Sequence, residues 1–197
     1  MTAANTTAGW GWVQRAIHWV AGGVILFQLG MGYYMVNFLG DFERFDQVQI
    51  HKSWGFVAFM LVALRIIWRA LNPTPAEPPM PDWQRMASRG SHIALYVLMV
   101  VLPLTGWLMS SASPLNDEDA YPFQIKNMVF GLFEMPDPYP VGDRDLAETF
   151  QAIHEFAAWG IAVLLILHVA AALKHQYVDR DGLLSRMITG QAETDRG

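Results

Sequence analysis

Long apolar stretches separated by short polar segments dominate the chain. The clearest one covers residues 147–177, where eighteen consecutive residues between Glu155 and Lys174 carry no charge. A helix rises about 1.5 Å per residue, and about 20 mainly apolar residues cross the hydrocarbon core of a bilayer. With its flanks this segment is long enough, so the pattern predicts a membrane-spanning helix.

Three earlier stretches have the same character, and they cover residues 13–38, 48–71 and 91–112. The first follows a short polar leader that lacks a clear small-residue cleavage site, so we interpret it as a retained span and not as a removed signal peptide. We therefore predict an all-α protein, a transmembrane four-helix bundle in which residues 1–197 form one membrane domain.

The basic residues indicate the orientation of the spans. One side of the predicted membrane receives Arg15, Arg65, Arg69, Arg85, Arg89, Lys174, Arg180 and Arg186, and the other receives Arg44, Lys52, Lys126 and Arg144. By the positive-inside rule the richer side is cytoplasmic, which places both termini in the cytoplasm. The linker at 113–145, which is acidic and rich in proline, then lies on the outer side of the membrane.

The composition agrees with a membrane protein, since 53% of the 197 residues are hydrophobic and only 16% are charged. The chain has no cysteine. This excludes disulfides, thiolate catalysis, iron–sulfur clusters and covalent haem attachment. No basic cluster indicates a nucleic-acid partner.

Histidines inside the apolar segments are the strongest functional signal, because ionisable groups in a membrane span are costly. His154 and His168 are fourteen residues apart on the last span. At about 100° and 1.5 Å per residue they lie within roughly 40° of the same face and about 21 Å apart along the axis. That face carries imidazoles at two depths.

The predicted topology pairs these histidines with two others. The first span runs outward with His18 near its cytoplasmic start, and the second runs inward with His51 near its outer start. His18 can therefore face His168 in the inner half, and His51 can face His154 in the outer half. Two imidazoles from facing helices can bind the iron of a planar macrocycle from both sides.

Haem explains these pairs better than zinc does, because zinc takes three or four protein ligands and each depth supplies only two histidines. We expect two non-covalent haem b groups, one for each pair. Since protein fills both axial positions, electron transfer is favoured over oxygen binding.

Three cations are candidates for binding haem propionates: Arg15 and Arg89 at the inner haem and Lys52 at the outer one. Anchoring at the membrane interface is the alternative. A flat ring is also expected to lie close to small residues, and packing between helices explains these equally well. The small residues are Gly22, Gly23, Gly55 and Gly160.

His92 and His175 are not assigned as axial ligands. His92 stands at the cytoplasmic start of the third span and competes with His18 as the partner of His168, while His175 follows His168 by seven residues. Contacts to an axial histidine, a propionate or a quinone are alternatives to an interfacial role.

Four segments in order resemble the bacterial cytochrome b561 family over nearly the whole chain: RAIHW at 15–19, IHKSWGF at 50–56, HIALYVLMVVLPLTGWLMSSA at 92–112 and HEFAAWGIAVLLILHVAAALKHQYVDRDGLLSRM at 154–187. The resemblance implies a di-haem b protein of the bacterial inner membrane. It also implies the pairs His18 with His168 and His51 with His154.

The resemblance further implies electron transfer between a periplasmic donor and the quinone pool, and one subgroup oxidises superoxide while reducing ubiquinone. We expect an oxidoreductase of this kind, with ubiquinone as a second cofactor. Its partners would be membrane lipid, a quinone and a small periplasmic donor or redox protein. Both a monomer and a homodimer are compatible with the sequence.

An electron-relay subunit that serves a dehydrogenase or a soluble cytochrome is the main alternative. The acidic linker repels an anion such as superoxide and suits a basic partner protein, although Lys52 and Lys126 could form a local positive entrance. A transporter with a histidine proton relay is disfavoured, because few carboxylates lie deep in the spans.

Overall fold

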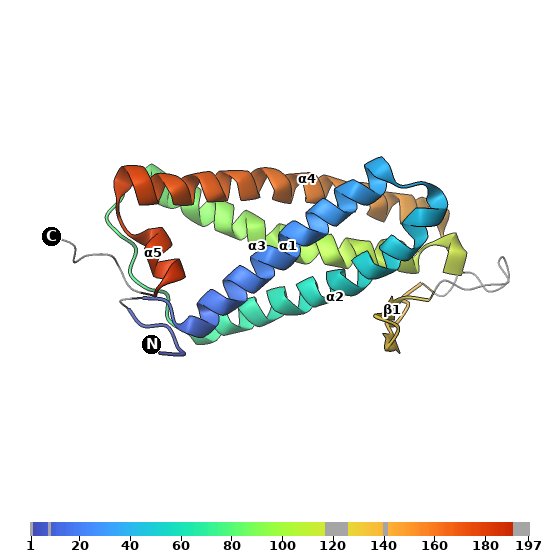
Figure 1. Cartoon of the computed structure of the whole chain (residues 1–197), viewed down its shortest axis with the longest axis horizontal. Helices are drawn as coiled ribbons and strands as arrows, with labels where there is room; N and C mark the ends of the chain where they lie inside the picture. Colours follow the sequence, from blue (N-terminus) through green and yellow to red (C-terminus); the bar gives the residue numbers. More distant parts are fainter. Residues whose placement is uncertain (1, 8, 117–125, 140–141, 191–197) are drawn as a thin grey trace. The chain divides into compact units, whose positions relative to one another are not determined.

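A computed structural model describes residues 2–7, 9–116, 126–139 and 142–190, with the backbone alone at residues 41 and 42. Four long helices dominate it: α1 (Trp12–Phe38), α2 (Asp41–Leu71), α3 (Asp82–Ser111) and α4 (Arg144–Lys174) (Figure 1). Each is long and apolar enough to cross a membrane. The predicted all-α class and the four candidate spans are therefore confirmed.

All four long helices begin before the predicted boundaries, and two of them begin well before. Helix α2 begins at Asp41, before the expected boundary at 48, and α3 begins at Asp82, before the expected boundary at 91. Asp82 lies in the first turn of α3, where a negative charge favours the helix dipole, and its carboxylate is 3.0 Å from Arg85 Nη1. Polar residues thus extend both helices beyond their apolar parts.

The remaining elements are short. They are the 3-10 turn η1 (Pro114–Asn116), the strands β1 (Met128–Val129) and β2 (Phe133–Glu134), the π-helical turn η2 (His175–Asp179) and α5 (Leu183–Ile188). The strands pair antiparallel, with Val129 opposite Phe133. Gly131 has φ 69°, a left-handed conformation that glycine adopts without steric cost, which allows the tight turn between the strands.

The chain divides into two compact units. The first unit comprises Met1–Gly23, Leu61–Tyr96 and Ala162–Gly197, and the second comprises Val24–Met60 and Val97–Ile161. Each unit contains one part of every long helix. His18, His92 and His168 belong to the first unit, and His51 and His154 belong to the second.

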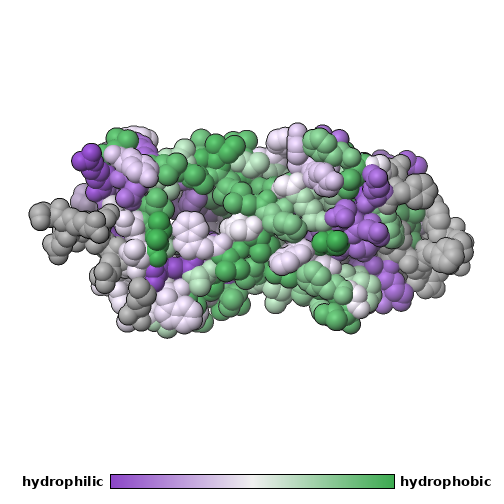
Figure 2. Space-filling view, viewed as in Figure 1, coloured by the Kyte–Doolittle hydropathy of each residue, from purple (hydrophilic) through white to green (hydrophobic). Residues whose placement is uncertain are grey.

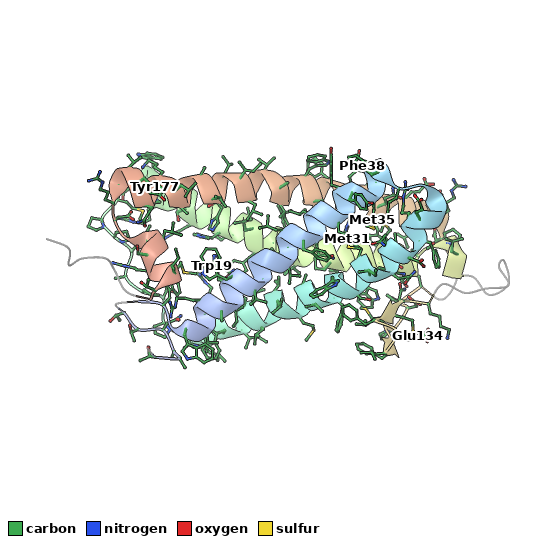
Figure 3. The ribbon with its side chains drawn as sticks, viewed as in Figure 1. Trp19, Met31, Met35, Phe38, Glu134 and Tyr177 are labelled. Carbon is green, nitrogen blue, oxygen red and sulfur yellow. The ribbon has the colours of Figure 1, made fainter. Side chains whose placement is uncertain are left out.

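The first unit ties the start of α1 to the end of the described chain. Arg15 Nη1 donates to the Ile188 carbonyl at 2.6 Å, and Trp19 Nε1 donates to the Met187 carbonyl at 2.9 Å. Figure 3 labels Trp19 on α1. Arg15 is only 8% exposed. Helix α5 therefore packs against the first turns of α1.

The second unit anchors the β1–β2 hairpin to the long helices. Ser53 Oγ accepts a hydrogen bond from the Phe130 amide at 2.9 Å, and Trp107 Nε1 donates to the Pro136 carbonyl at 3.0 Å. Val129 of the hairpin is only 4% exposed. The hairpin is thus attached to α2 and its following residues to α3.

Large apolar side chains remain exposed along the long helices, and they cover much of the surface visible in Figure 2. Phe156 and Ile166 of α4, for example, are 82% and 69% exposed. Exposed apolar surface on this scale is unfavourable in water and favourable in lipid. The helices therefore have the surface of membrane spans.

Candidate haem-binding sites

His51 of α2 and His154 of α4 face each other in the second unit. Their ring centres are 6.3 Å apart, and the ring planes are inclined by 78°. A metal–imidazole bond is about 2 Å long, and a ring centre lies about 1.2 Å from its nitrogen, so two axial imidazoles have centres about 6.4 Å apart. The observed separation fits one iron between the two rings.

A hydrogen bond holds the His154 ring in the tautomer that can bind a metal. Its Nδ1 is 2.8 Å from the Leu102 carbonyl oxygen of α3. A carbonyl can only accept, so Nδ1 carries the proton and Nε2 keeps its lone pair. Histidines that bind metals commonly have such a partner, which fixes the tautomer and the ring orientation.

Gly106 allows this contact. It follows Leu102 by one helical turn and therefore lies on the same face of α3. A Cβ atom at residue 106 would lie 3.0 Å from His154 Cε1 and 3.1 Å from Nδ1. The missing side chain lets the imidazole approach the α3 backbone, and this glycine was not among those singled out from the sequence.

His51 is held differently. Its Nδ1 is buried and has no hydrogen-bond partner among the described residues. The nearest support is at its backbone, where Gln28 Nε2 donates to the His51 carbonyl at 2.9 Å. The ring of His154 is thus oriented by the protein to a greater extent than the ring of His51.

Three histidines gather in the first unit. The ring centres of His18 and His168 are 6.2 Å apart, and those of His92 and His168 are 5.5 Å apart. The first separation fits an iron between the rings, whereas the second is nearly 1 Å shorter than the expected distance of about 6.4 Å. The geometry therefore favours His18 over His92 as the partner of His168.

Arg65 and Arg69 of α2 contact Tyr96 of α3, which follows His92 by one helical turn. Arg65 Nε donates to the hydroxyl oxygen of Tyr96 at 3.0 Å, and the guanidinium carbons of Arg65 and Arg69 lie 5.4 and 5.8 Å from the Tyr96 ring centre. From the sequence, both arginines were assigned only to the cytoplasmic side of the membrane.

The two arginines predicted to bind propionates have protein partners. Arg15 donates to the Ile188 carbonyl, as described above. Arg89 forms a 3.2 Å ion pair with Glu77, and its side chain is 64% exposed. Contact of either residue with a propionate stays a prediction.

Lys52, the predicted propionate partner in the second unit, is bonded to α3 and to the linker. Its Nζ donates to Ser110 Oγ and to Asn127 Oδ1, both at 3.0 Å. Asn127 in turn donates to the carboxylate of Asp137. A propionate role for Lys52 also stays a prediction. Three acidic linker residues, Asp117, Glu118 and Asp119, lie outside the described residues.

The four small residues from the sequence analysis differ in surroundings. An added Cβ at Gly160 would lie 3.2 Å from Leu98 Cδ1, and one at Gly55 would lie 3.4 Å from Gln28 Nε2. These contacts favour helix packing as their role. At Gly22 and Gly23 an added Cβ would meet no atom within 4 Å.

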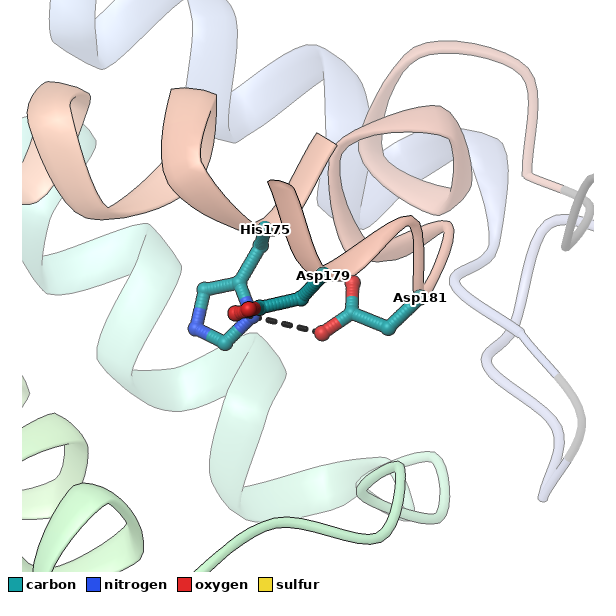
Figure 4. Close-up of side chains that lie close together, drawn as sticks. All are labelled: His175, Asp179 and Asp181. Atoms are coloured by element: carbon teal, nitrogen blue, oxygen red, sulfur yellow. Dashed lines mark hydrogen bonds and ion pairs between the residues drawn. The ribbon is translucent and has the colours of Figure 1, made fainter. Parts of the chain in front are cut away.

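His175 belongs to a polar cluster at the end of α4 (Figure 4). Its Nδ1 is 2.5 Å from Asp181 Oδ2 and 3.2 Å from Asp179 Oδ2. These atoms have the chemistry of metal ligands. Lys174, however, binds both carboxylate oxygens of Asp179, and Asp181 also accepts the Leu183 amide. The cluster joins α4 to α5.

Four candidate membrane helices with paired histidines at the separation of axial ligands define the class of membrane-bound b-type cytochromes. The model of the prokaryotic cytochrome b561 family matches residues 9–190. The chain belongs to this family, which consists of haem-binding electron-transfer proteins, and it is a multi-pass protein of the bacterial inner membrane.

Named relatives agree with this assignment. The chain is 31% identical to cytochrome b561 homolog 2 of Escherichia coli K12, and the alignment covers both chains completely. It is 26% identical to cytochrome b561 homolog 1 of the same organism, over 89% of this chain and 94% of the relative. It is also 28% identical to the probable superoxide oxidase CybB of Yersinia pestis, over 89% of this chain and 93% of that protein.

Proposed function

We propose that the protein is a di-haem b cytochrome that transfers electrons between a periplasmic donor, such as superoxide, and ubiquinone. His18 and His168 would hold one haem, and His51 and His154 the other. The observation that carries the proposal is the ring separation in the two pairs, 6.2 Å and 6.3 Å, which match the distance expected across one iron.

When bound, haem supplies a one-electron carrier at each pair. The protein's contribution is to orient the ligands and exclude water. The Leu102 carbonyl fixes the tautomer of His154, and both pairs lie on helices long and apolar enough to cross a membrane. With two axial histidines, each haem iron would be six-coordinate, which favours electron transfer over oxygen binding.

The proposed orientation has both termini in the cytoplasm. It is supported by the excess of arginine and lysine in the segments predicted to be inside. The bond between Arg15 and the Ile188 carbonyl also brings the start of α1 to the end of the described chain. The pair formed by His51 and His154 would then lie in the periplasmic half.

Superoxide is supported as the donor by the similarity to the probable superoxide oxidase CybB. Two superoxide anions would each lose one electron to form oxygen. Ubiquinone would take up the two electrons and two protons to form ubiquinol. Ubiquinone is thus the proposed acceptor and second cofactor.

A relay subunit remains the second candidate, and the acidic linker favours it. Among its described residues are Asp137, Asp143 and Asp145, which would attract a basic redox protein and repel superoxide. In this case the protein would pass electrons between a partner dehydrogenase or a soluble cytochrome and the quinone pool.

Haem content tests the core of the proposal. The purified protein should contain two haems b per chain and show a reducible b-type spectrum. His51→Ala and His154→Ala should each remove one haem, and His18→Ala and His168→Ala should each remove the other. A wild-type protein with one haem, or with none, contradicts the two-site assignment.

Rapid mixing separates the two candidate donors. Superoxide should reduce the haems of the purified protein much faster than it dismutates, and ubiquinone should then reoxidise them. Haem reduction no faster than the uncatalysed reaction excludes superoxide oxidation and favours the relay.

A further inference from the structure

We propose that Arg65 binds a propionate of the haem held by His18 and His168. The inference rests on the proposed function, because it takes these two histidines as the axial ligands. From the sequence alone, Arg15 and Arg89 were the candidates for the propionates of this haem, and Arg65 was counted only among the basic residues of the cytoplasmic side.

The side chain of Arg65 contacts Tyr96 of α3 and is half-buried. Its Nε donates to the Tyr96 hydroxyl at 3.0 Å, and its guanidinium carbon lies 5.4 Å from the centre of the Tyr96 ring. Two contacts with one aromatic residue fix the position of the guanidinium group. An interfacial arginine that extends into water would not need them.

Tyr96 connects Arg65 with the part of α3 that carries His92. It follows His92 by four residues, so both lie on one face of α3. The ring centre of His92 in turn lies 5.5 Å from that of His168. Tyr96, to which Arg65 is bound, is therefore one helical turn from a residue that contacts the ligand His168.

Arg65 has no carboxylate partner among the described residues, unlike several other cations of the first unit. Arg85 and Arg89 pair with Glu77, and Lys174 pairs with Asp179. A guanidinium group in a membrane span is costly without a counter-ion. We therefore expect that a bound anion, and not a protein carboxylate, is the counter-ion of Arg65.

A haem propionate has the required chemistry. The two Nη groups of an arginine form a fork that matches the two oxygens of a carboxylate, and Nε is already used by Tyr96. Each haem carries two propionates at its edge. A lipid phosphate group offers similar anionic oxygens and is the competing source.

Arg69 provides a matched control. It lies one turn further along α2, and its guanidinium carbon is 5.8 Å from the same tyrosine ring. It makes no hydrogen bond to the Tyr96 hydroxyl, and it is exposed where Arg65 is half-buried. Removing Arg69 changes the charge of the same region and leaves the proposed contact in place.

The test compares Arg65→Gln, Arg65→Lys and Arg69→Gln in nanodiscs, with the midpoint potential of each haem as the readout. A positive charge beside a propionate favours the reduced haem. Arg65→Gln should therefore lower the potential of the haem at His18 and His168 and leave the other haem unchanged. Arg65→Lys should restore most of the potential, and Arg69→Gln should have a much smaller effect.

Esterified haem identifies the anion. In protein reconstituted with haem dimethyl ester the carboxylates are blocked, so Arg65→Gln should shift the potential much less than it does with ordinary haem. An equal shift with both haems would mean that Arg65 acts on the iron through its charge alone, and this would overturn the proposal. A shift that appears only with anionic lipid, and not in phosphatidylcholine nanodiscs, would assign Arg65 to a lipid phosphate and also overturn it.

The number of haems per chain distinguishes a failure of the propionate contact from a failure of the axial assignment. If the wild-type protein contains two haems and Arg65→Gln leaves both potentials unchanged, the propionate contact is wrong and the di-haem function stands. If His18→Ala and His168→Ala both retain two haems, the axial assignment itself fails.

Discussion

The contact between Gly106 and His154 shows how a single residue can position a ligand. A Cβ at residue 106 would come within 3.1 Å of His154 Nδ1, and the same ring depends on its hydrogen bond to the Leu102 carbonyl. The glycine and the carbonyl thus act together on one imidazole.

Gly106→Ala is expected to move the ring away from α3 and weaken that hydrogen bond. Loss of one such bond costs about 1 kcal/mol, which corresponds to roughly fivefold to tenfold weaker haem binding. Haem dissociation from the site at His51 and His154 is the measurement. Gly30→Ala is the control, since an added Cβ there meets no atom within 4 Å. Equal dissociation rates in the two variants would contradict this role of Gly106.

His92 offers a second test at the residue scale. Its ring centre lies 5.5 Å from that of His168, too close for one iron between the rings. His92→Ala should therefore retain both haems with low-spin spectra, whereas His18→Ala should lose the haem of the first unit. The opposite pattern would make His92 the axial ligand. Haem-to-protein ratios and absorption spectra of the two variants decide between them.

At the scale of elements, the β1–β2 hairpin is joined to the helices by a polar network. Asn127 is only 3% exposed and connects Lys52 of α2 with Asp137 of the linker. Removing its side chain leaves buried polar groups unpaired, which costs more than the loss of an exposed contact.

Asn127→Ala is expected to loosen the hairpin by roughly 1–3 kcal/mol, because Lys52 and Asp137 lose their common partner. Amide hydrogen exchange of residues 126–139 in nanodiscs measures this. Lys126→Ala is the matched control: its ion pair with Glu134 is about half exposed and contributes about 1 kcal/mol or less. Protection of the hairpin should fall clearly in the first variant and little in the second, and equal protection in both would refute the role of Asn127.

The long helices were predictable because a bilayer requires continuous apolar runs, and their polar extensions were not. Residues 41–47 and 82–90 contain many charges, so hydropathy assigned them to connections, although the structure makes them helical. The hairpin was also missed. Its strands have two residues each, too few for an alternating pattern.

The histidine pairs could be predicted because depth along antiparallel spans follows from counting residues, whereas lateral contacts do not. The carbonyl beside His154 and the aromatic ring beside Arg65 depend on packing between helices. One signal was nevertheless present. Arg65 follows His51 by fourteen residues, the same spacing that separates His154 from His168. This spacing places Arg65 on the face that carries His51 and at the depth of His168.

At the scale of the whole molecule, the proposed topology can be tested with reporters. Green fluorescent protein fused after residue 197 should fluoresce, since it folds in the cytoplasm. Alkaline phosphatase fused within residues 117–125 should be active, because it requires the periplasm. An inactive phosphatase in the linker together with a dark C-terminal fusion would invert the orientation and exchange the sides of the two histidine pairs.

The contacts that close the first unit link residues 173 and 168 positions apart, Arg15 with Ile188 and Trp19 with Met187. Chains are synthesised at about 5–20 residues per second, so the interval between the synthesis of Arg15 and that of Ile188 is on the order of 10–30 s. During that interval the newly synthesised first span cannot form its contacts with residues 187 and 188. A ribosome that stalls before codon 187 would release a chain that quality-control proteases can recognise by this unfinished end.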